Sequence, residues 1–187
     1  PARKTLLILG GSQGARYLYE TLMAAIPLLD TPLLASAQIL WSTGTDNFAD
    51  LESRLAAVSP RHLSVRLRPF IDQMGLAYAV ADVALARAGS STIAELLANG
   101  IYALYVPLPA AIYDHQTFNA QQVARVGAGE LVVQKELTPE MAAQAIGRLF
   151  GKAEIGRKIP VPAELDSREA ARTLADALCL ATGNSGC

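Results

Sequence analysis

The sequence lacks the features that mark membrane-spanning, disulfide-stabilised and nucleic-acid-binding chains. No apolar run reaches the roughly 20 residues that span a bilayer. The two cysteines, Cys179 and Cys187, lie near the end and match no metal-ligand spacing, which favours a reduced cytosolic compartment. The net charge is −1, which argues against a general nucleic-acid binder. The start, 1–4, holds a basic pair but no convincing signal peptide.

Familiar catalytic arrangements are also missing. The sequence has no Ser-His-Asp, Cys-His or paired-His metal spacing. His115 lies in a polar loop where its only carboxylate neighbour is Asp114, and such a histidine is more often solvated or a cap than a catalyst. These absences predict a binding apparatus rather than a complete catalytic set.

What is present is typical of one α/β domain. Hydrophobic residues make up 51% of the chain and charged residues 18%, which fits one good-sized core and argues against disorder. Strand-like and helix-like segments alternate, which predicts a Rossmann-like parallel sheet with helices on both faces. The expected strands are residues 5–9, 38–41, 63–67, 80–86, 103–106 and 131–133, and the expected helices are residues 15–29, 46–58, 72–80, a helix from 90–92 onward, 116–126, 139–149 and 166–181.

The stretch 87–95, Arg-Ala-Gly-Ser-Ser-Thr-Ile-Ala-Glu, follows an apolar strand and opens a helix. Gly89 lets the backbone turn, and any residue of Ser90–Thr92 could cap the helix. A helix start at this edge of the sheet presents free N–H groups and the positive end of its dipole, which suit a phosphate. Glu95 lies about one turn further in, where it could accept hydrogen bonds from a ribose. The alternative is an ordinary capping box of Thr-x-x-Glu spacing.

Two further loops carry polar or glycine residues after strands. Gly10–Gly14 reads Gly-Gly-x-x-Gly, a weak signal of a nucleotide and a fair signal of close backbone approach, with Ser12 best placed to touch a phosphate. A tight turn with a packing glycine is the alternative. The segment 114–116, Asp-His-Gln, with Asn119 one turn on, mixes donors and acceptors that suit hydroxyl-rich ligands such as sugars.

Together these motifs resemble the C-terminal, donor-binding domain of the MurG family, the GT-B glycosyltransferases of family 28. In order and spacing, the resemblance is carried by Gly-Gly-Ser-Gln-Gly-Ala-Arg at 10–16, Phe70-Ile71 with Met74 and Tyr78, Arg87-Ala88-Gly89 with Thr92 and Glu95, and Asp114-His115-Gln116 with Asn119-Ala120. It covers nearly all of 1–187, which we interpret as a single nucleotide-sugar-binding domain, the C-terminal half of a GT-B enzyme. We expect the N-terminal acceptor domain to be absent from this sequence.

The resemblance implies the UDP-GlcNAc-binding half of an inverting N-acetylglucosaminyltransferase that converts lipid I to lipid II in peptidoglycan synthesis, and so serves cell wall biogenesis, cell shape and cell division. The implied partners are UDP-GlcNAc and, through the missing half, the lipid-linked muramyl-pentapeptide acceptor. No metal, cofactor or nucleic acid is implied. The full-length enzyme would be cytoplasmic and peripheral on the cytoplasmic face of the plasma membrane. Its catalytic residues are unknown and expected in the missing half, so we expect this chain alone to transfer nothing.

The resemblance also implies roles for individual residues. Ser12 would contact the donor near its diphosphate, the backbone of Ile71 would read the uracil edge, and Gln116 would hold hydroxyls of the GlcNAc. The helix start would hold the phosphates, with the carboxylate on the ribose hydroxyls; its residues are Ser90, Ser91, Thr92, Ile93, Ala94 and Glu95.

Two alternatives stay open. The chain could be the donor domain of another UDP-sugar lipid glycosyltransferase, such as a lipid glucosyltransferase or the donor subunit of a dolichol-linked GlcNAc transferase. It could also be a non-catalytic nucleotide-binding module with the same doubly wound fold.

Overall fold

The structure is a computed structural model that describes residues 3–10, 16–29, 36–58, 63–109, 114–153, 158–160, 162 and 165. Ser12, with most of the glycine-rich loop, and the helix expected at 166–181 lie outside the described residues.

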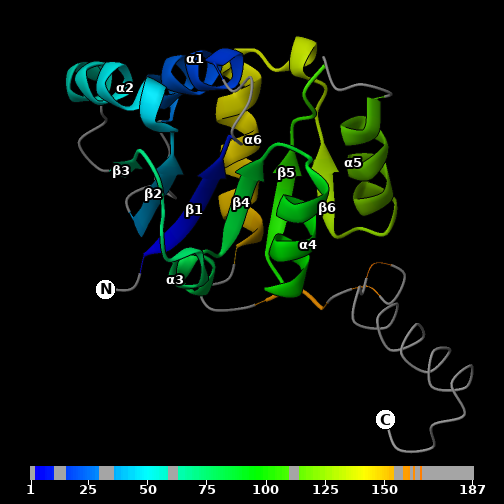
Figure 1. The fold of residues 1–187 in the computed structure, drawn as a ribbon. Coiled ribbons are helices and arrows are strands. Elements are labelled where there is room, and N and C mark those ends of the chain that lie inside the picture. The colour runs from blue at the N-terminus through cyan, green and yellow to red at the C-terminus, as the bar shows by residue number, and fades with distance from the viewer. Residues whose placement is uncertain are drawn as a thin grey trace, which may run out of the picture.

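Six parallel strands form the centre of the fold, in the order β3-β2-β1-β4-β5-β6 (Figure 1). The strands are β1 (Lys4–Leu9), β2 (Ala37–Ser42), β3 (Ser64–Arg68), β4 (Val83–Ala86), β5 (Tyr102–Tyr105) and β6 (Gly129–Leu131). The helices are α1 (Arg16–Ala25), α2 (Thr45–Val58), α3 (Met74–Val80), α4 (Ser90–Ala98), α5 (His115–Arg125) and α6 (Pro139–Lys152), with 3₁₀ turns η1 (Ile26–Leu28) and η4 (Gln134–Glu136). The predicted doubly wound α/β architecture is confirmed.

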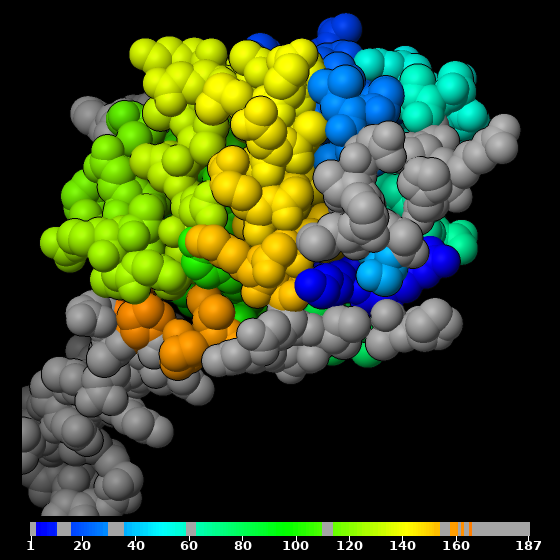
Figure 2. Space-filling model, turned by 180° about the vertical axis from the view of Figure 1, so that it is seen from behind, coloured from blue at the N-terminus to red at the C-terminus, as the bar shows by residue number. Residues whose placement is uncertain are grey.

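Two apolar layers pack against the sheet, one on each face. Residues of α1, α2 and α6 form one layer, and residues of α3, α4 and α5 form the other. Figure 2 shows α6, in yellow, on the surface of the first face. The central strand is apolar without alternation because both of its faces are covered: Leu6, Leu7 and Ile8 are all buried.

Local sequence explains where several elements begin and end. The first helix was expected to reach residue 29, but α1 ends at Ala25, and a 3₁₀ turn continues because Pro27 has no N–H to donate. The helix expected at 72–80 begins at Met74. The start of α6 is confirmed, since Thr138 Oγ1 accepts a hydrogen bond from the Met141 N–H at 3.2 Å and proline follows the cap.

The last strand was expected at 131–133, but β6 runs from Gly129 to Leu131. A Cβ at Gly129 would lie 2.7 Å from the Ala103 carbonyl oxygen, so glycine lets β6 approach β5 closely enough to pair. The apolar Val132-Val133 pair that suggested the later start follows the strand instead.

The amino-terminal ends of the strands are closed by a returning segment of the chain. The Ile159 N–H donates to the Gly100 carbonyl at 2.7 Å, and Lys158 Nζ donates to the carbonyls of Ala81 at 2.5 Å and Tyr78 at 3.1 Å. Burial lowers the pKa of Lys158, with the nearby carboxylate of Asp82 acting in the opposite direction. The open edge of the sheet is therefore the opposite one, where the strands end. Among the described helices, none combines the length and apolar character needed to cross a bilayer.

Candidate functional site

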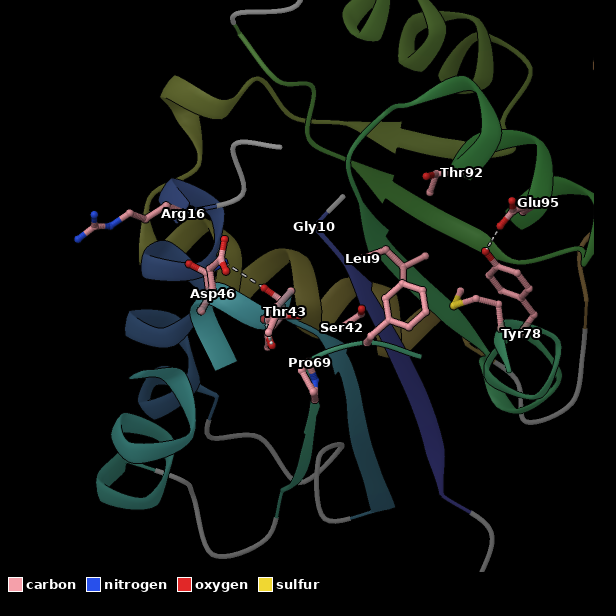
Figure 3. Close-up of a pocket in the computed structure, with 15 residues that line it drawn as sticks. Leu9, Gly10, Arg16, Ser42, Thr43, Asp46, Pro69, Tyr78, Thr92 and Glu95 are labelled. Atoms are coloured by element: carbon pink, nitrogen blue, oxygen red, sulfur yellow. Dashed lines mark hydrogen bonds between the residues drawn. The ribbon is translucent and has the colours of Figure 1, made fainter. Parts of the chain in front are cut away.

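A cleft of about 640 Å³ lies at the carboxyl ends of β1, β2 and β3 (Figure 3). Helices α1, α2, α3 and α4 and the end of β2 contribute its polar side chains. Its lining residues are Leu9, Gly10, Arg16, Ser42, Thr43, Gly44, Thr45, Asp46, Asn47, Pro69, Phe70, Met74, Tyr78, Thr92 and Glu95. This is the edge at which ligands of open parallel sheets bind.

Helix α4 begins beside the cleft, but its cap differs from the expectation. The N-cap is Gly89, in an extended conformation, and no side chain caps the helix. The expectation that one of Ser90, Ser91 or Thr92 caps it is therefore wrong: all three lie inside the helix. In the first positions of a helix the N–H groups have no acceptor within the helix. The first intrahelical bond runs from the Ile93 N–H to the Gly89 carbonyl at 3.0 Å, so the helix donors available to an anion end at Thr92.

The remaining predicted residues of α4 divide between core and cleft. Ile93 is buried, so its side chain belongs to the core, whereas the side chain of Ala94 is exposed. Thr92 and Glu95 both line the cleft. The expected alternative of a Thr-Glu capping box does not form, because Thr92 is not the cap.

Glu95 has a partner that the sequence did not assign. The Tyr78 hydroxyl, on α3, donates to Glu95 Oε2, and Figure 3 shows the two side chains meeting at one end of the cleft. Tyr78 is 5% exposed. Burial raises its pKa, and the hydrogen bond and charge of Glu95 raise it further, so the phenol stays a proton donor at neutral pH.

An apolar groove of about 580 Å³ adjoins the cleft. Phe70 lines both, and it is 68% exposed. Ile71, predicted to read uracil, lines the groove rather than the cleft itself. A planar base could therefore lie against Phe70 and Ile71 while the rest of a nucleotide extends into the cleft.

Gln116, at the start of α5, is not among the residues that line the cleft. Its Oε1 accepts a hydrogen bond from the Leu108 N–H at 3.0 Å, so its carbonyl is committed to the loop after β5. Asn119 Nδ2 donates to the Ala88 carbonyl at 3.3 Å, which ties α5 to the turn before α4. Asp114, the N-cap, has a φ of 52° and makes no side-chain cap bond. The structure thus brings together Thr92 and Glu95, while Gln116 holds neighbouring backbone.

Sequence reasoning gave Arg87 no role, although it opens the central motif. It is 4% exposed and donates to the carbonyls of Val106 at 3.0 Å and Pro107 at 3.1 Å and to Gln134 Oε1 at 2.7 Å. Burial lowers its pKa. A charged residue directly after a fully apolar strand was the available signal, because a buried guanidinium must find acceptors.

Gly10 supports the packing alternative for the first glycine loop. A Cβ there would lie 2.0 Å from the Tyr19 hydroxyl, so tyrosine packing alone requires glycine. The same hydroxyl donates to the Ser42 carbonyl at 3.2 Å, and burial raises the pKa of Tyr19 to about 12. Ser42 and its neighbours Thr43, Asp46 and Asn47 line the cleft without having been predicted to do so. Within the described ranges, no cluster of three His, Cys, Asp or Glu side chains could hold a metal ion.

Comparisons with known proteins agree with this geometry. The family described as "Glycosyltransferase family 28 C-terminal domain" matches residues 5–174. The enzyme of Nitrosococcus oceani named UDP-N-acetylglucosamine--N-acetylmuramyl-(pentapeptide) pyrophosphoryl-undecaprenol N-acetylglucosamine transferase is 46% identical over 144 residues, 77% of this chain and 39% of that enzyme. The enzyme of the same name from Solidesulfovibrio magneticus is 37% identical over 179 residues, 88% of this chain and 48% of the enzyme. The chain thus spans less than half of the length of these curated relatives.

Solved structures give the same picture. The crystal structure of Acinetobacter baumannii MurG superimposes with a TM-score of 0.70 at 36% identity, over 79% of this chain and 41% of that one. The glycotransferase of kitacinnamycin superimposes with a TM-score of 0.61 at 22% identity, over 81% of this chain and 36% of that one, which shows a shared fold.

Proposed function

The chain belongs to glycosyltransferase family 28, and from this we propose that it is the UDP-GlcNAc-binding C-terminal half of an inverting N-acetylglucosaminyltransferase that converts lipid I to lipid II in peptidoglycan synthesis. The full-length enzyme would take the lipid-linked muramyl-pentapeptide through its other half. It would act at the cytoplasmic face of the plasma membrane, bound peripherally.

One observation carries the proposal: the first turn of α4 and the carboxylate of Glu95 border the same cleft. The free N–H groups of Ser90, Ser91 and Thr92 supply donors for a diphosphate, and the helix dipole favours its negative charge. Glu95 lies about one turn further along α4, where a carboxylate can accept hydrogen bonds from ribose hydroxyls. A nucleoside diphosphate matches both features at once.

The remaining roles follow the order of groups in UDP-GlcNAc. The uracil would lie in the groove beside Phe70, with the backbone of Ile71 at its edge. Gln116 would reach hydroxyls of the GlcNAc through its amide N–H groups, since its carbonyl oxygen already accepts the Leu108 N–H. Ser12 would contact the donor near its diphosphate.

In the proposed reaction, an acceptor hydroxyl attacks the anomeric carbon of GlcNAc from the face opposite the diphosphate. The new C–O bond forms as the bond to the diphosphate breaks, and UDP leaves with the electron pair, so the configuration inverts. The N–H groups at the start of α4 stabilise the negative charge that grows on the leaving phosphate. The base that removes the proton of the acceptor hydroxyl is expected in the other half of the enzyme.

Calorimetric titration of the 187-residue chain with UDP, UDP-GlcNAc, UDP-glucose and UDP-galactose tests the proposal. We expect weak binding of UDP, a preference for UDP-GlcNAc among the sugars, and loss of that preference in Gln116→Ala. A preference for another UDP-sugar would favour a different lipid glycosyltransferase, and an unchanged UDP-GlcNAc affinity in Gln116→Ala would favour a non-catalytic nucleotide-binding module. We expect no GlcNAc transfer by this chain alone, and measurable turnover would contradict the assignment of catalysis to the other half.

A further inference from the structure

The Tyr78–Glu95 contact joins two helices at the wall of the cleft. Tyr78 lies on α3 and Glu95 on α4, 17 residues apart in sequence, and both line the cleft. Glutamate on an exposed helix position has three rotatable side-chain bonds and samples many orientations. A hydrogen bond from a fixed donor restricts that sampling before any ligand arrives.

Tyr78 is well suited to be a fixed donor. Its ring is buried in the apolar layer formed by α3, α4 and α5. Its backbone is held as well, since Lys158 Nζ donates to the Tyr78 carbonyl at 3.1 Å. The ring and the backbone of Tyr78 are therefore both held by the surrounding protein, whereas Glu95 is exposed.

The contact leaves Glu95 able to accept further hydrogen bonds. An ionised carboxylate has about four lone-pair positions, and the phenol occupies one of those on Oε2. Oε1 and the second position on Oε2 remain, and two acceptors in one plane match two adjacent hydroxyl groups. Glu95 has no ion-pair partner within the described part of the chain, so its charge is directed to these contacts.

We propose that Tyr78 is a positioning residue that orients the Glu95 carboxylate for the adjacent hydroxyls of a ribose, and that this orientation makes the cleft select ribonucleotides over 2′-deoxyribonucleotides. The inference rests on the proposed function, since it assigns a specificity device to the same nucleotide site. A site built to bond a hydroxyl rejects the analogue that lacks it, because the acceptor is then left unmatched. A carboxylate that is not held in one orientation can turn to the 3′-hydroxyl that 2′-deoxyribose keeps, so it discriminates less between the two sugars.

The test compares UDP with 2′-deoxy-UDP by calorimetry on the 187-residue chain. The unmodified chain should prefer UDP. Tyr78→Phe removes one oxygen and keeps the ring, and it should reduce that preference about fivefold, mainly by weakening UDP, because a misaligned carboxylate keeps only part of its hydrogen bonding to the ribose. The affinity for 2′-deoxy-UDP should change less than about twofold, because that ligand makes fewer contacts with Glu95.

Tyr102→Phe is the matched control. Tyr102 also donates to a glutamate, Glu130 Oε1 at 3.4 Å, but it begins β5 at the opposite edge of the sheet. It should leave the preference unchanged. Glu95→Asp keeps the charge but draws it back by one methylene from the Tyr78 hydroxyl, so it should lose the preference as Tyr78→Phe does. If Tyr78→Phe lowers the melting temperature more than Tyr102→Phe does, the result with Glu95→Asp decides the test instead.

The outcomes distinguish a failure of the inference about Tyr78 from a failure of the proposed nucleotide-binding function. Undiminished preference in Tyr78→Phe or Glu95→Asp overturns the inference, as does an equal loss of UDP and 2′-deoxy-UDP, which a merely structural role would give. If the unmodified chain binds neither nucleotide, the proposed function itself fails, and the inference with it.

Discussion

Two glutamates each accept a hydrogen bond from a tyrosine, yet their surroundings differ. Glu130, on β6, also accepts from Lys152 at 3.0 Å and lies 3.5 Å from Arg148. Lys152 in turn donates to the Tyr102 hydroxyl at 2.8 Å, which closes the cluster. Among the described residues, the side chain of Glu95 accepts a hydrogen bond from the Tyr78 phenol alone, and it lines the cleft (Figure 3).

The difference separates a structural carboxylate from one available to a ligand. Burial of Glu130 acts to raise its pKa, but the hydrogen bond and charge of Lys152 and the charge of Arg148 outweigh it, and the pKa is lowered. Its charge is thus neutralised by the protein. A phenol orients the carboxylate of Glu95 without neutralising it, so a ligand hydroxyl can still gain a strong hydrogen bond there.

The largest effect is expected for Arg87. Its substitution tests whether a charged side chain near the carboxyl ends of the strands is structural because it bonds to protein groups, or binds ligand because of where it lies. Arg87 directly follows β4 at the carboxyl ends of the strands, but its guanidinium is buried against protein acceptors. Arg87→Ala leaves those acceptors without their donor and should lower the free energy of unfolding by about 3 kcal/mol or more. Urea denaturation measures the loss, with the half-exposed Arg54 replaced by alanine as the control. A stable Arg87→Ala variant that only loses UDP binding would show that location decides.

Glu95→Gln gives the next effect and addresses the comparison directly. Removing the charge that faces the cleft should weaken UDP binding by about 2 kcal/mol, the range of a hydrogen bond to a charged group. The free energy of unfolding should change by less than about 1 kcal/mol, because the amide oxygen of glutamine can still accept the hydrogen bond from the Tyr78 hydroxyl. Calorimetry and urea denaturation provide the two measurements. Glu130→Gln is the reciprocal control and should leave UDP binding unchanged; weakened UDP binding in that variant would remove the distinction between the two glutamates.

Glu130→Gln should instead cost stability, about 1 kcal/mol at neutral pH, as for one member of a partly buried charge cluster. The pKa of Glu130 is lowered on folding from its ordinary 4.5, so its ionised form stabilises the fold. This contribution is fully present above pH 4.5 and is lost as the pH falls through the lowered pKa. The difference in unfolding free energy between the two proteins should therefore shrink on acidification. A difference that stays constant with pH would mean that the charge of Glu130 does not contribute.

The smallest effect on stability is expected at Glu20, a surface carboxylate whose ion pair serves as the exposed counterpart of the Glu130 cluster. Its pKa is lowered chiefly by the hydrogen bond from Arg54, whose NH2 lies 2.7 Å from Glu20 Oε2. Both side chains are well exposed, at 45% and 38%, and solvent screens the pair. Glu20→Gln should change the free energy of unfolding by only a few tenths of a kcal/mol, and less in high salt. A loss as large as that of Glu130→Gln would indicate that exposure does not distinguish the two ion pairs.

The sequence predicted the fold and polar loops at the sheet edge where the cleft lies, but not which side chains meet there. Apolar runs predicted the strands, and Thr138-Pro139 predicted the start of α6, because both signals act over a few residues. The predicted cap of α4 was wrong because local sequence offered three adjacent hydroxyl residues, whereas the helix begins one residue earlier and has Gly89 as its N-cap. The assigned roles of Ile71 and Gln116 stay predictions, as does that of Ser12, which lies outside the described residues.

By itself the sequence determined the alternation of strands and helices and the polar character of the loops that follow the strands, since both depend on local pattern. Only the tertiary structure decided which donor holds Glu95 and which acceptors bury Arg87. Tyr78 lies on a separate helix, and Gln134 is 47 residues from Arg87. The first pair meets because α3 and α4 pack in the same apolar layer, and the second because β4, β5 and β6 lie side by side in the sheet. Their partners therefore depend on how the elements pack rather than on local sequence.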